Sequence, residues 1–184
     1  MFDSIIDPTI GPVNGTSDAF ALAARPDSLS GLRLGLLANT KRNAEQFLEE
    51  VSKILTEDYG VASVVARKKP DITNTAPEPI LEDLRTGADV VVVGVGDCGS
   101  CSASAVADGI VLEQSGVPAA VVCTDAFTAS ASAMARVRGV PDYQYLTVPH
   151  PMANLTADGV HDKASRAAAG IVGMLTSRAL AAAS

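Results

Sequence analysis

Ala88-Asp-Val-Val-Val-Val-Gly-Val-Gly-Asp-Cys-Gly-Ser-Cys-Ser-Ala-Ser104 is the stretch of sequence that decides the fold. Its first part is a dense apolar run, which predicts a buried strand over residues 89–95. Two glycines and Asp97 interrupt the run, and the small residues that follow predict a helix that begins at the second cysteine, Cys101. The stretch therefore places two thiols, Cys98 and Cys101, in a turn between a strand and a helix.

On both sides of this stretch, strand patterns alternate with helix patterns. Strands are predicted over 32–38, 61–67, 89–95, 117–123 and 143–148, and helices over 41–57, 78–86, 102–115, 126–138 and 158–183. Because a helix between two strands acts as a long crossover, the strands are expected to run parallel, with helices on both faces. The predicted fold class is α/β: a three-layer, doubly wound, mainly parallel five-stranded sheet of the flavodoxin-like or Rossmann-like type.

Residues 1–30 carry turn signals that lie too close together for a long regular element. They are predicted to form an arm that lies on the domain or across a neighbouring subunit, and residues 31–184 are predicted to form a single α/β domain. The arm holds apolar residues with no obvious core position, namely Phe2, Ile5, Ile6, Phe20 and Leu22. We therefore expect a homodimer, and a different partner subunit is equally consistent with the sequence.

Composition limits the classes of partner and compartment. The 184 residues carry a formal net charge of -7 with no basic stripe, which argues against nucleic acid as a partner. No apolar run approaches the roughly 20 residues of a membrane span, and the N-terminus lacks a basic region before an apolar one, so we expect no membrane and a soluble, cytoplasmic protein. Three cysteines are too few for a disulfide framework, so the paired thiols suggest redox, catalytic or metal chemistry.

The Cys-Gly-Ser-Cys turn favours a reactive thiol. Backbone N–H groups and the positive end of a helix dipole stabilise a thiolate, so Cys98 is predicted to be an exposed nucleophile and Cys101 its resolving partner. Two alternatives stay open. Free cysteines are also good small core residues, and a zinc site would need two more ligands, for which Cys123 and His150 are the candidates. Because there is no second close cysteine pair, no metal is assigned.

Ligands of a doubly wound sheet bind at the carboxyl ends of its strands, so residues that follow the strands are expected to converge there. Cys98, Asn39, Asp125 and His150 all follow predicted strands. The Pro149-His150-Pro151 turn would hold an imidazole in a fixed direction. We therefore predict that His150 or Asp97 handles protons, with a half-exposed turn histidine as the alternative.

The remaining candidate residues surround the same place. The predicted substrate contacts are Asn39, Thr40, Lys41, Gly99, Ser100 and Ser102. Asn39 or Thr40 would also serve as a helix cap there, whatever the function. The pair Gly94 and Gly96 is only a fragment of the dinucleotide fingerprint, because no third glycine follows at the required spacing. We therefore predict no nucleotide and no other cofactor.

These residues resemble the UGSC family, which is named for a selenocysteine-Gly-Ser-Cys motif and has members with cysteine in the first position. The likeness covers roughly residues 30–152. It is carried by Gly94-Val-Gly-Asp-Cys-Gly-Ser-Cys-Ser102, Asn39-Thr-Lys41, Asp108-Gly-Ile-Val-Leu-Glu-Gln-Ser-Gly-Val-Pro118 and Pro149-His-Pro151. The resemblance implies that Cys98 occupies the selenocysteine position, and hence a need for a strong nucleophile of low pKa or a redox centre. It supplies a site without a reaction.

Three functions follow as hypotheses. The first is a thiol/disulfide-type oxidoreductase that acts on a small-molecule substrate and uses a thiol reductant, with Cys98 as nucleophile and Cys101 as resolving thiol. The second is a non-redox lyase or isomerase in which Cys98 adds covalently or acts as acid or base. The third is a metal- or ligand-binding subunit of a larger complex.

Overall fold

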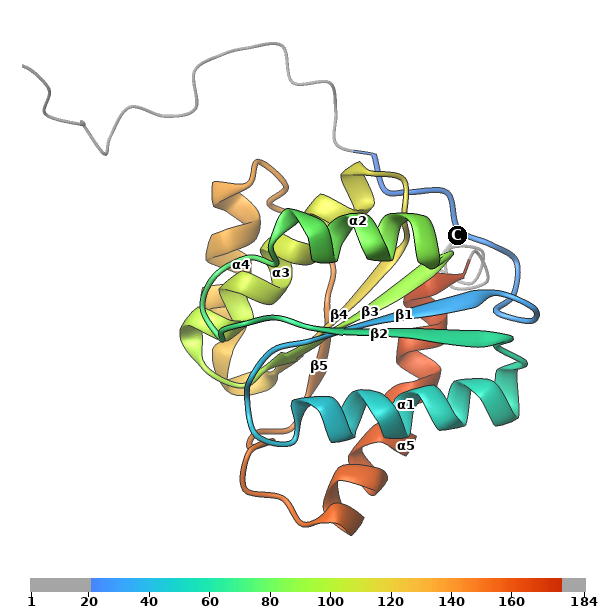
Figure 1. Ribbon diagram of the computed structural model, residues 1–184. Helices are drawn as coiled ribbons and strands as arrows, with labels where there is room; N and C mark the ends of the chain where they lie inside the picture. Colours follow the sequence, from blue (N-terminus) through green and yellow to red (C-terminus); the bar gives the residue numbers. More distant parts are fainter. Residues whose placement is uncertain (1–20, 177–184) are drawn as a thin grey trace, which may run out of the picture.

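A five-stranded, all-parallel sheet forms the centre of the computed structural model, which describes residues 21–176 (Figure 1). The strand order is β2-β1-β3-β4-β5. The strands are β1 (Arg33–Ala38), β2 (Ser63–Lys68), β3 (Val90–Gly96), β4 (Ala119–Thr124) and β5 (Leu146–Val148). This order is that of flavodoxin-like folds, so the predicted α/β class is confirmed and the flavodoxin-like alternative is the one that the chain adopts.

Helices cover both faces of the sheet. On one face lie α1 (Ala44–Tyr59) and α5 (Ala157–Leu175), which pack against each other. On the other face lie α2 (Glu78–Gly87), α3 (Gly99–Gln114) and α4 (Thr128–Val137), with α3 against α4 (Figure 1). Each face has its own apolar core, built mostly of valine, leucine and alanine. The strands β3 and β4 are buried along their whole length, as continuous apolar strands between two helical layers should be.

Several boundaries differ from those predicted. The last strand is limited to Leu146–Val148. Tyr143, at the start of the predicted strand, instead packs in the core between α3 and the sheet, with its hydroxyl oxygen close to Gly109. The predicted helix over 126–138 is preceded by a separate 3₁₀ turn, Asp125–Phe127. The predicted end of the last helix, residues 177–183, lies outside the described residues.

The start predicted for α3, at Cys101 or Ser102, is two or three residues too late. The helix begins at Gly99, and Cys98 is its N-cap in an extended conformation. The sulfur of Cys98 accepts the backbone N–H of Cys101 at 3.3 Å, which is what Ser or Asp does at other helix starts. A sulfur atom in the capping position therefore replaces the usual oxygen, and Cys101 lies in the first turn of the helix.

The part of the predicted arm that the structure describes lies on the domain. The guanidinium of Arg25 forms a bidentate ion pair with Glu113, at 2.7 Å, and Glu113 is fully buried at the end of α3. Arg25 also donates to the carbonyl of Met174 on α5. Leu22 is exposed, and Phe2, Ile5, Ile6 and Phe20 lie outside the described residues. Among residues 21–176, no helix has both the length and the apolar character needed to cross a bilayer.

Candidate functional site

The candidate site lies at the carboxyl end of the sheet, where the strand order reverses between β1 and β3. That point is where doubly wound sheets bind their ligands, because the loops after the two strands diverge to opposite faces. The loop after β1 is tied to the end of β3, since the N–H of Asn39 donates to the carbonyl of Gly94 at 3.2 Å. The residues that follow β4 and β5 join the same place: Asp125 accepts the N–H of His150 at 3.0 Å. The expected convergence of strand ends is therefore observed.

Cys98 and Cys101 form a disulfide in the structure, with their Cα atoms 5.3 Å apart, a separation typical of such bonds. The two residues differ in exposure: Cys98 is half-buried and Cys101 is fully buried. Each sulfur also lies near a backbone donor, because the N–H of Cys101 points to Cys98 at 3.3 Å and the N–H of Asp97 points to Cys101 at 3.1 Å. Donors of this kind stabilise negative charge on sulfur when the pair is reduced.

A glycine lets α3 begin so close to the end of β3. A Cβ atom at Gly96 would lie 2.6 Å from the hydroxyl oxygen of Ser102 and 2.7 Å from the sulfur of Cys123. Ser102 is therefore packed inward beside Cys123, whereas Ser100 is exposed. Burial raises the pKa of the Cys123 thiol to about 12, so this third cysteine is a core residue without thiolate character.

Asp97 and His150 form a hydrogen-bonded pair beside the cysteines. Asp97 is almost fully buried, and its Oδ1 lies 2.8 Å from Nδ1 of His150. The same carboxylate accepts the backbone N–H groups of Met152 at 3.0 Å and Ala153 at 3.1 Å. With Nδ1 directed to a carboxylate, the proton of the neutral imidazole resides on Nδ1, and Nε2 becomes the proton acceptor. The imidazole is 39% exposed, so it can reach a bound molecule.

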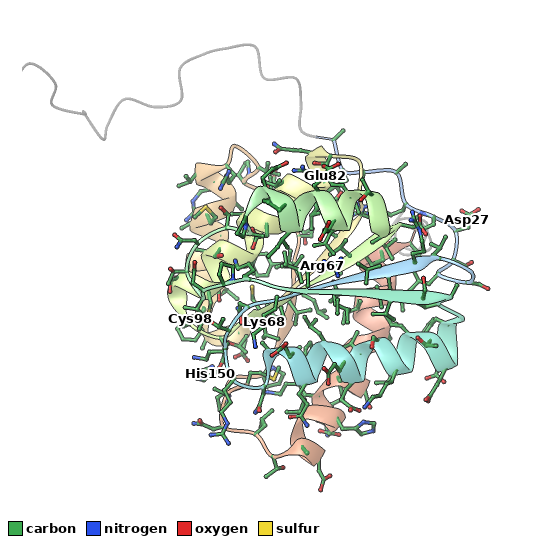
Figure 2. All side chains as sticks on the ribbon, in the orientation of Figure 1. Asp27, Arg67, Lys68, Glu82, Cys98 and His150 are labelled. Carbon is green, nitrogen blue, oxygen red and sulfur yellow. A yellow bond between two sulfur atoms is a disulfide. The ribbon has the colours of Figure 1, made fainter. Side chains whose placement is uncertain are left out.

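Two neighbours of His150 were missed by the sequence analysis. The hydroxyl of Thr124, the last residue of β4, lies 3.3 Å from Nδ1 of His150. The ring of Phe127 meets the imidazole edge to face, with ring centroids 5.4 Å apart. Thr124 ends β4 and Phe127 lies in the turn that follows, so their positions alone could have indicated that they lie near the site. Their residue types do not indicate chemistry. Figure 2 shows Cys98 and His150 toward the same end of the molecule.

In the loop after β1, the side chain of Asn39, a predicted substrate contact, is used in hydrogen bonds to the backbone. Asn39 is buried, its amide donates to the carbonyl of Val95 at 3.0 Å, and its oxygen accepts the N–H of Lys41. The cap of α1 is neither Asn39 nor Thr40 but Asn43, which adopts a left-handed conformation with φ 67°. Thr40 is exposed, and the ammonium of Lys41 lies 3.9 Å from Asp97.

Within residues 21–176 there is no group of three or more histidine, cysteine or acidic side chains placed to hold a metal ion. In the structure, where Cys98 and Cys101 are joined, the four candidate zinc ligands Cys98, Cys101, Cys123 and His150 do not gather into such a group. Gly99, a predicted substrate contact, lies in the first turn of α3, where an added Cβ atom would come within 3.2 Å of the hydroxyl oxygen of Ser130.

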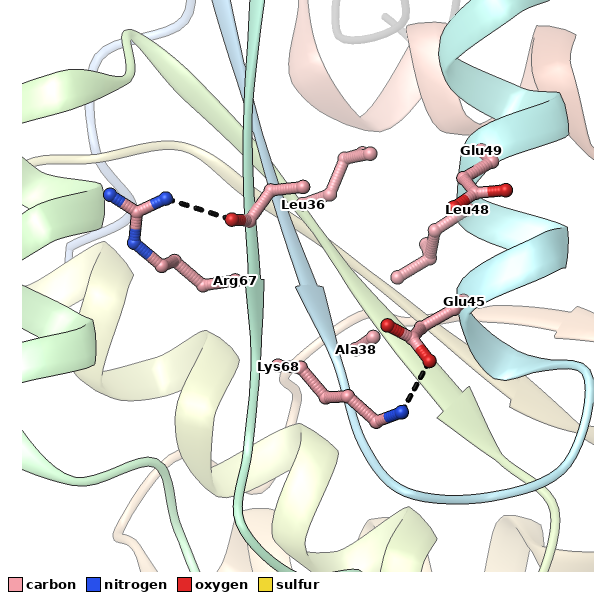
Figure 3. A pocket seen from close by; sticks show the side chains of 8 residues that line it. Leu36, Ala38, Glu45, Leu48, Glu49, Arg67 and Lys68 are labelled. Carbon is pink, nitrogen blue, oxygen red and sulfur yellow. Dashed lines mark hydrogen bonds and ion pairs between the residues drawn. The ribbon is translucent and has the colours of Figure 1, made fainter.

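A pocket of about 110 Å³ lies apart from these residues, at the open edge of the sheet between α1 and β2 (Figure 3). Its floor is apolar and includes Leu36 and Leu48. Its rim is charged, and the ammonium of Lys68 is paired with Glu45 across it. None of the predicted site residues lines this pocket.

Comparisons with known proteins give a family and no activity. No curated protein matches the sequence. The model of the UGSC family matches residues 4–177, a span that contains the Cys98–Cys101 turn, the loop after β1 and the His150 turn. Because this match covers nearly the whole chain and every loop that builds the site, the chain belongs to the UGSC family.

Proposed function

We propose that this protein is a thiol-dependent oxidoreductase in which Cys98 attacks the substrate, Cys101 resolves the adduct, and His150 moves the proton. One observation carries the proposal. A half-buried cysteine caps one helix and a buried cysteine lies in its first turn, each sulfur has a backbone donor, and the carboxylate of the preceding residue, Asp97, orients an imidazole. Neither apolar packing nor helix capping alone requires that combination of groups.

The unequal exposure of the two cysteines assigns their roles. A substrate reaches Cys98 first, because Cys101 is fully buried beneath the turn. The Cα atom of Cys101 lies 5.3 Å from that of Cys98, the helix cap, so Cys101 can attack an adduct on Cys98 without movement of the backbone.

The proposed reaction is written for a hydroperoxide as oxidant. The Cys98 thiolate attacks the distal peroxide oxygen, an S–O bond forms, the O–O bond breaks, and the alcohol leaves with a proton supplied by His150. The Cys101 thiol then attacks Cys98, an S–S bond forms, and water leaves. One hydroperoxide and two thiols give one alcohol, one water and one disulfide. Two molecules of a small thiol reductant restore the pair by exchange.

The Asp97 carboxylate is proposed to orient His150 rather than to transfer protons itself. Both of its oxygens already accept hydrogen bonds, from the imidazole and from two backbone N–H groups. It also stabilises the imidazolium that forms whenever Nε2 takes up a proton.

The proposal is tested by intact mass after treatment of the reduced protein with dilute hydrogen peroxide. We expect the wild type to lose two hydrogen atoms, reversibly with a reductant. Cys98→Ser should not react, and Cys101→Ser should gain one oxygen atom on Cys98. Cys123→Ser is the matched control and should behave as the wild type does. Unreactive thiols in the freshly reduced wild type would overturn the proposal.

A second candidate function is non-redox catalysis, as in a lyase or isomerase. The observation that favours it is the Asp97–His150 pair, since an imidazole oriented by the residue that precedes Cys98 also suits covalent or acid–base catalysis without a disulfide. The two functions differ in their need for Cys101. Rapid alkylation of Cys98 by iodoacetamide, combined with thiols that are inert to peroxide, would favour this second function.

The proposed partners are a small-molecule substrate, a thiol reductant and either a second copy of the chain or a different subunit. The assembly is tested by light scattering of the full chain and of a chain without residues 1–28. A monomer in both cases would remove the arm from the proposal.

A further inference from the structure

The turn that carries His150 is held almost entirely by side chains from other parts of the chain. Its backbone N–H groups donate to carboxylates. The N–H of His150 donates to Asp125, and the N–H groups of Met152 and Ala153 donate to Asp97. Such a turn has little regular structure of its own, so the orientation of the imidazole depends on these long-range contacts.

The carbonyl groups of the same turn are held by two donors. Asn43, the cap of α1, donates to the carbonyls of Met152 and Leu155, each at 3.0 Å. Lys163, on α5, donates to the carbonyl of Pro149 and, at 2.9 Å, to that of Pro151. The ammonium of Lys163 therefore bridges the residue before His150 and the residue after it.

This arrangement is unusual for a helix surface lysine, which normally keeps its ammonium in water. Burial lowers the pKa of Lys163, and the carboxylates of Asp97 and Asp125 act in the opposite direction. The ammonium thus lies within the field of the two carboxylates that hold the turn, instead of pairing with either one directly.

We propose that Lys163 is a positioning residue for His150. By donating to the carbonyls of Pro149 and Pro151, Lys163 holds the imidazole in the orientation in which Nδ1 faces Asp97. Its relevance to catalysis rests on the proton-transfer role proposed above for His150. A displacement of about 1 Å at a catalytic group slows a reaction by up to about a hundredfold. Loss of the two hydrogen bonds from Lys163 should therefore have a measurable effect on the reaction rate.

The chain contains two histidines, which makes a direct test possible. Long-range ¹H–¹⁵N correlation spectra distinguish which imidazole nitrogen carries the proton, at about pH 8 where a histidine of ordinary pKa is neutral. His161→Gln identifies the signals of His150. Three charged side chains contact His150 or the residues next to it: Asp97 after β3, Asp125 in the 3₁₀ turn and Lys163 on α5.

In the wild type we expect His150 to carry its proton on Nδ1. In Lys163→Met we expect a mixture of both tautomers and an approximately tenfold slower oxidation of Cys98 by hydrogen peroxide. Lys163→Arg, which keeps a cationic donor, should restore both. Lys53→Met, an exposed lysine on α1, is the matched control and should change neither. A Lys163→Met protein with the wild-type tautomer overturns the inference.

Failure of the proposed function gives a different result. If His150→Asn is oxidised by peroxide as rapidly as the wild type, His150 has no role in that reaction. The tautomer of His150 in the Lys163 variants would still decide whether Lys163 positions it.

Discussion

Replacing the Asp97 carboxylate by an amide tests how the site is held together. Asp97→Asn keeps the shape of the side chain but turns one of its two acceptor oxygens into a donor. Both oxygens face donors: Oδ1 faces His150 and Met152, and Oδ2 faces Ala153. Whichever way the amide is turned, its NH₂ group meets a backbone N–H that loses its partner.

The magnitude follows from these contacts. One buried N–H without a partner costs about 1–3 kcal/mol. The other hydrogen bonds persist but lose the assistance of the negative charge, which is about half of their strength and adds roughly 1 kcal/mol. We therefore expect Asp97→Asn to lower the free energy of unfolding by about 2–4 kcal/mol. We also expect peroxide oxidation of Cys98 to slow by about a hundredfold, because a neutral amide no longer stabilises the imidazolium that forms when Nε2 takes up a proton.

The assay for stability is urea unfolding followed by far-UV circular dichroism, since the chain has no tryptophan. Asp125→Asn is the matched control. Its amide oxygen can still accept the N–H of His150, so it should cost less than about 1 kcal/mol. An Asp97→Asn protein that unfolds at the wild-type urea concentration would show that the contacts of this carboxylate do not hold the turn.

Three further predictions concern the frame around the site. Lys69→Met should lower the free energy of unfolding, measured in urea, by about 3–5 kcal/mol. The reason is that Asp108 would stay buried on α3 without the ammonium that now lies 2.7 Å away. A loss of less than about 1 kcal/mol, as for an exposed ion pair, would contradict this expectation. Gly96→Ala should cost about 1–3 kcal/mol in the same assay through the close contact of its Cβ with Ser102 and Cys123, whereas Gly87→Ala, with 3.5 Å to its nearest neighbour, should cost less. Hydrogen bonds from Asn74 and Thr73 lower the pKa of Asp71 to about 2, so its contribution to stability is present above its ordinary pKa of about 4 and is lost as the pH falls toward 2. Asp71→Asn should therefore differ from the wild type in urea midpoint at pH 5 and converge with it near pH 2, and a constant difference would refute the assignment.

The alternation of elements could be predicted from the sequence because each element carries its own local signal. Continuous apolar runs such as Val90–Gly96 indicate strands buried between two helical layers, and amphipathic spacing indicates α1. The strand order could not be predicted in the same way. It depends on the side of β1 to which each crossover turns, and no short segment of sequence records that choice.

The candidate site also contains residues that the sequence indicates and residues that it does not. Cys98, Asp97 and His150 could be predicted as candidates because strand ends converge in any doubly wound sheet and because their residue types carry chemistry. Asn43 and Lys163 were missed, although they hold the His150 turn. Asn43 contacts Met152 across 109 residues of sequence, and neither a helix cap nor a helix surface lysine suggests a contact with a distant loop.

The two halves of the site are therefore built on different principles. The cysteine half is local: Cys98 caps α3, the nearest donors come from Asp97 and Cys101, and the glycine at 96 sets the approach of helix to strand. The histidine half is assembled from β3, the turn after β4, the loop before α1 and α5. Loosening α5 or the loop before α1 should thus displace His150 while the environment of the two sulfurs is kept. If the proposed reaction is correct, such changes slow proton transfer and leave the ability of the cysteines to form their disulfide intact, so the two halves can be separated by experiment.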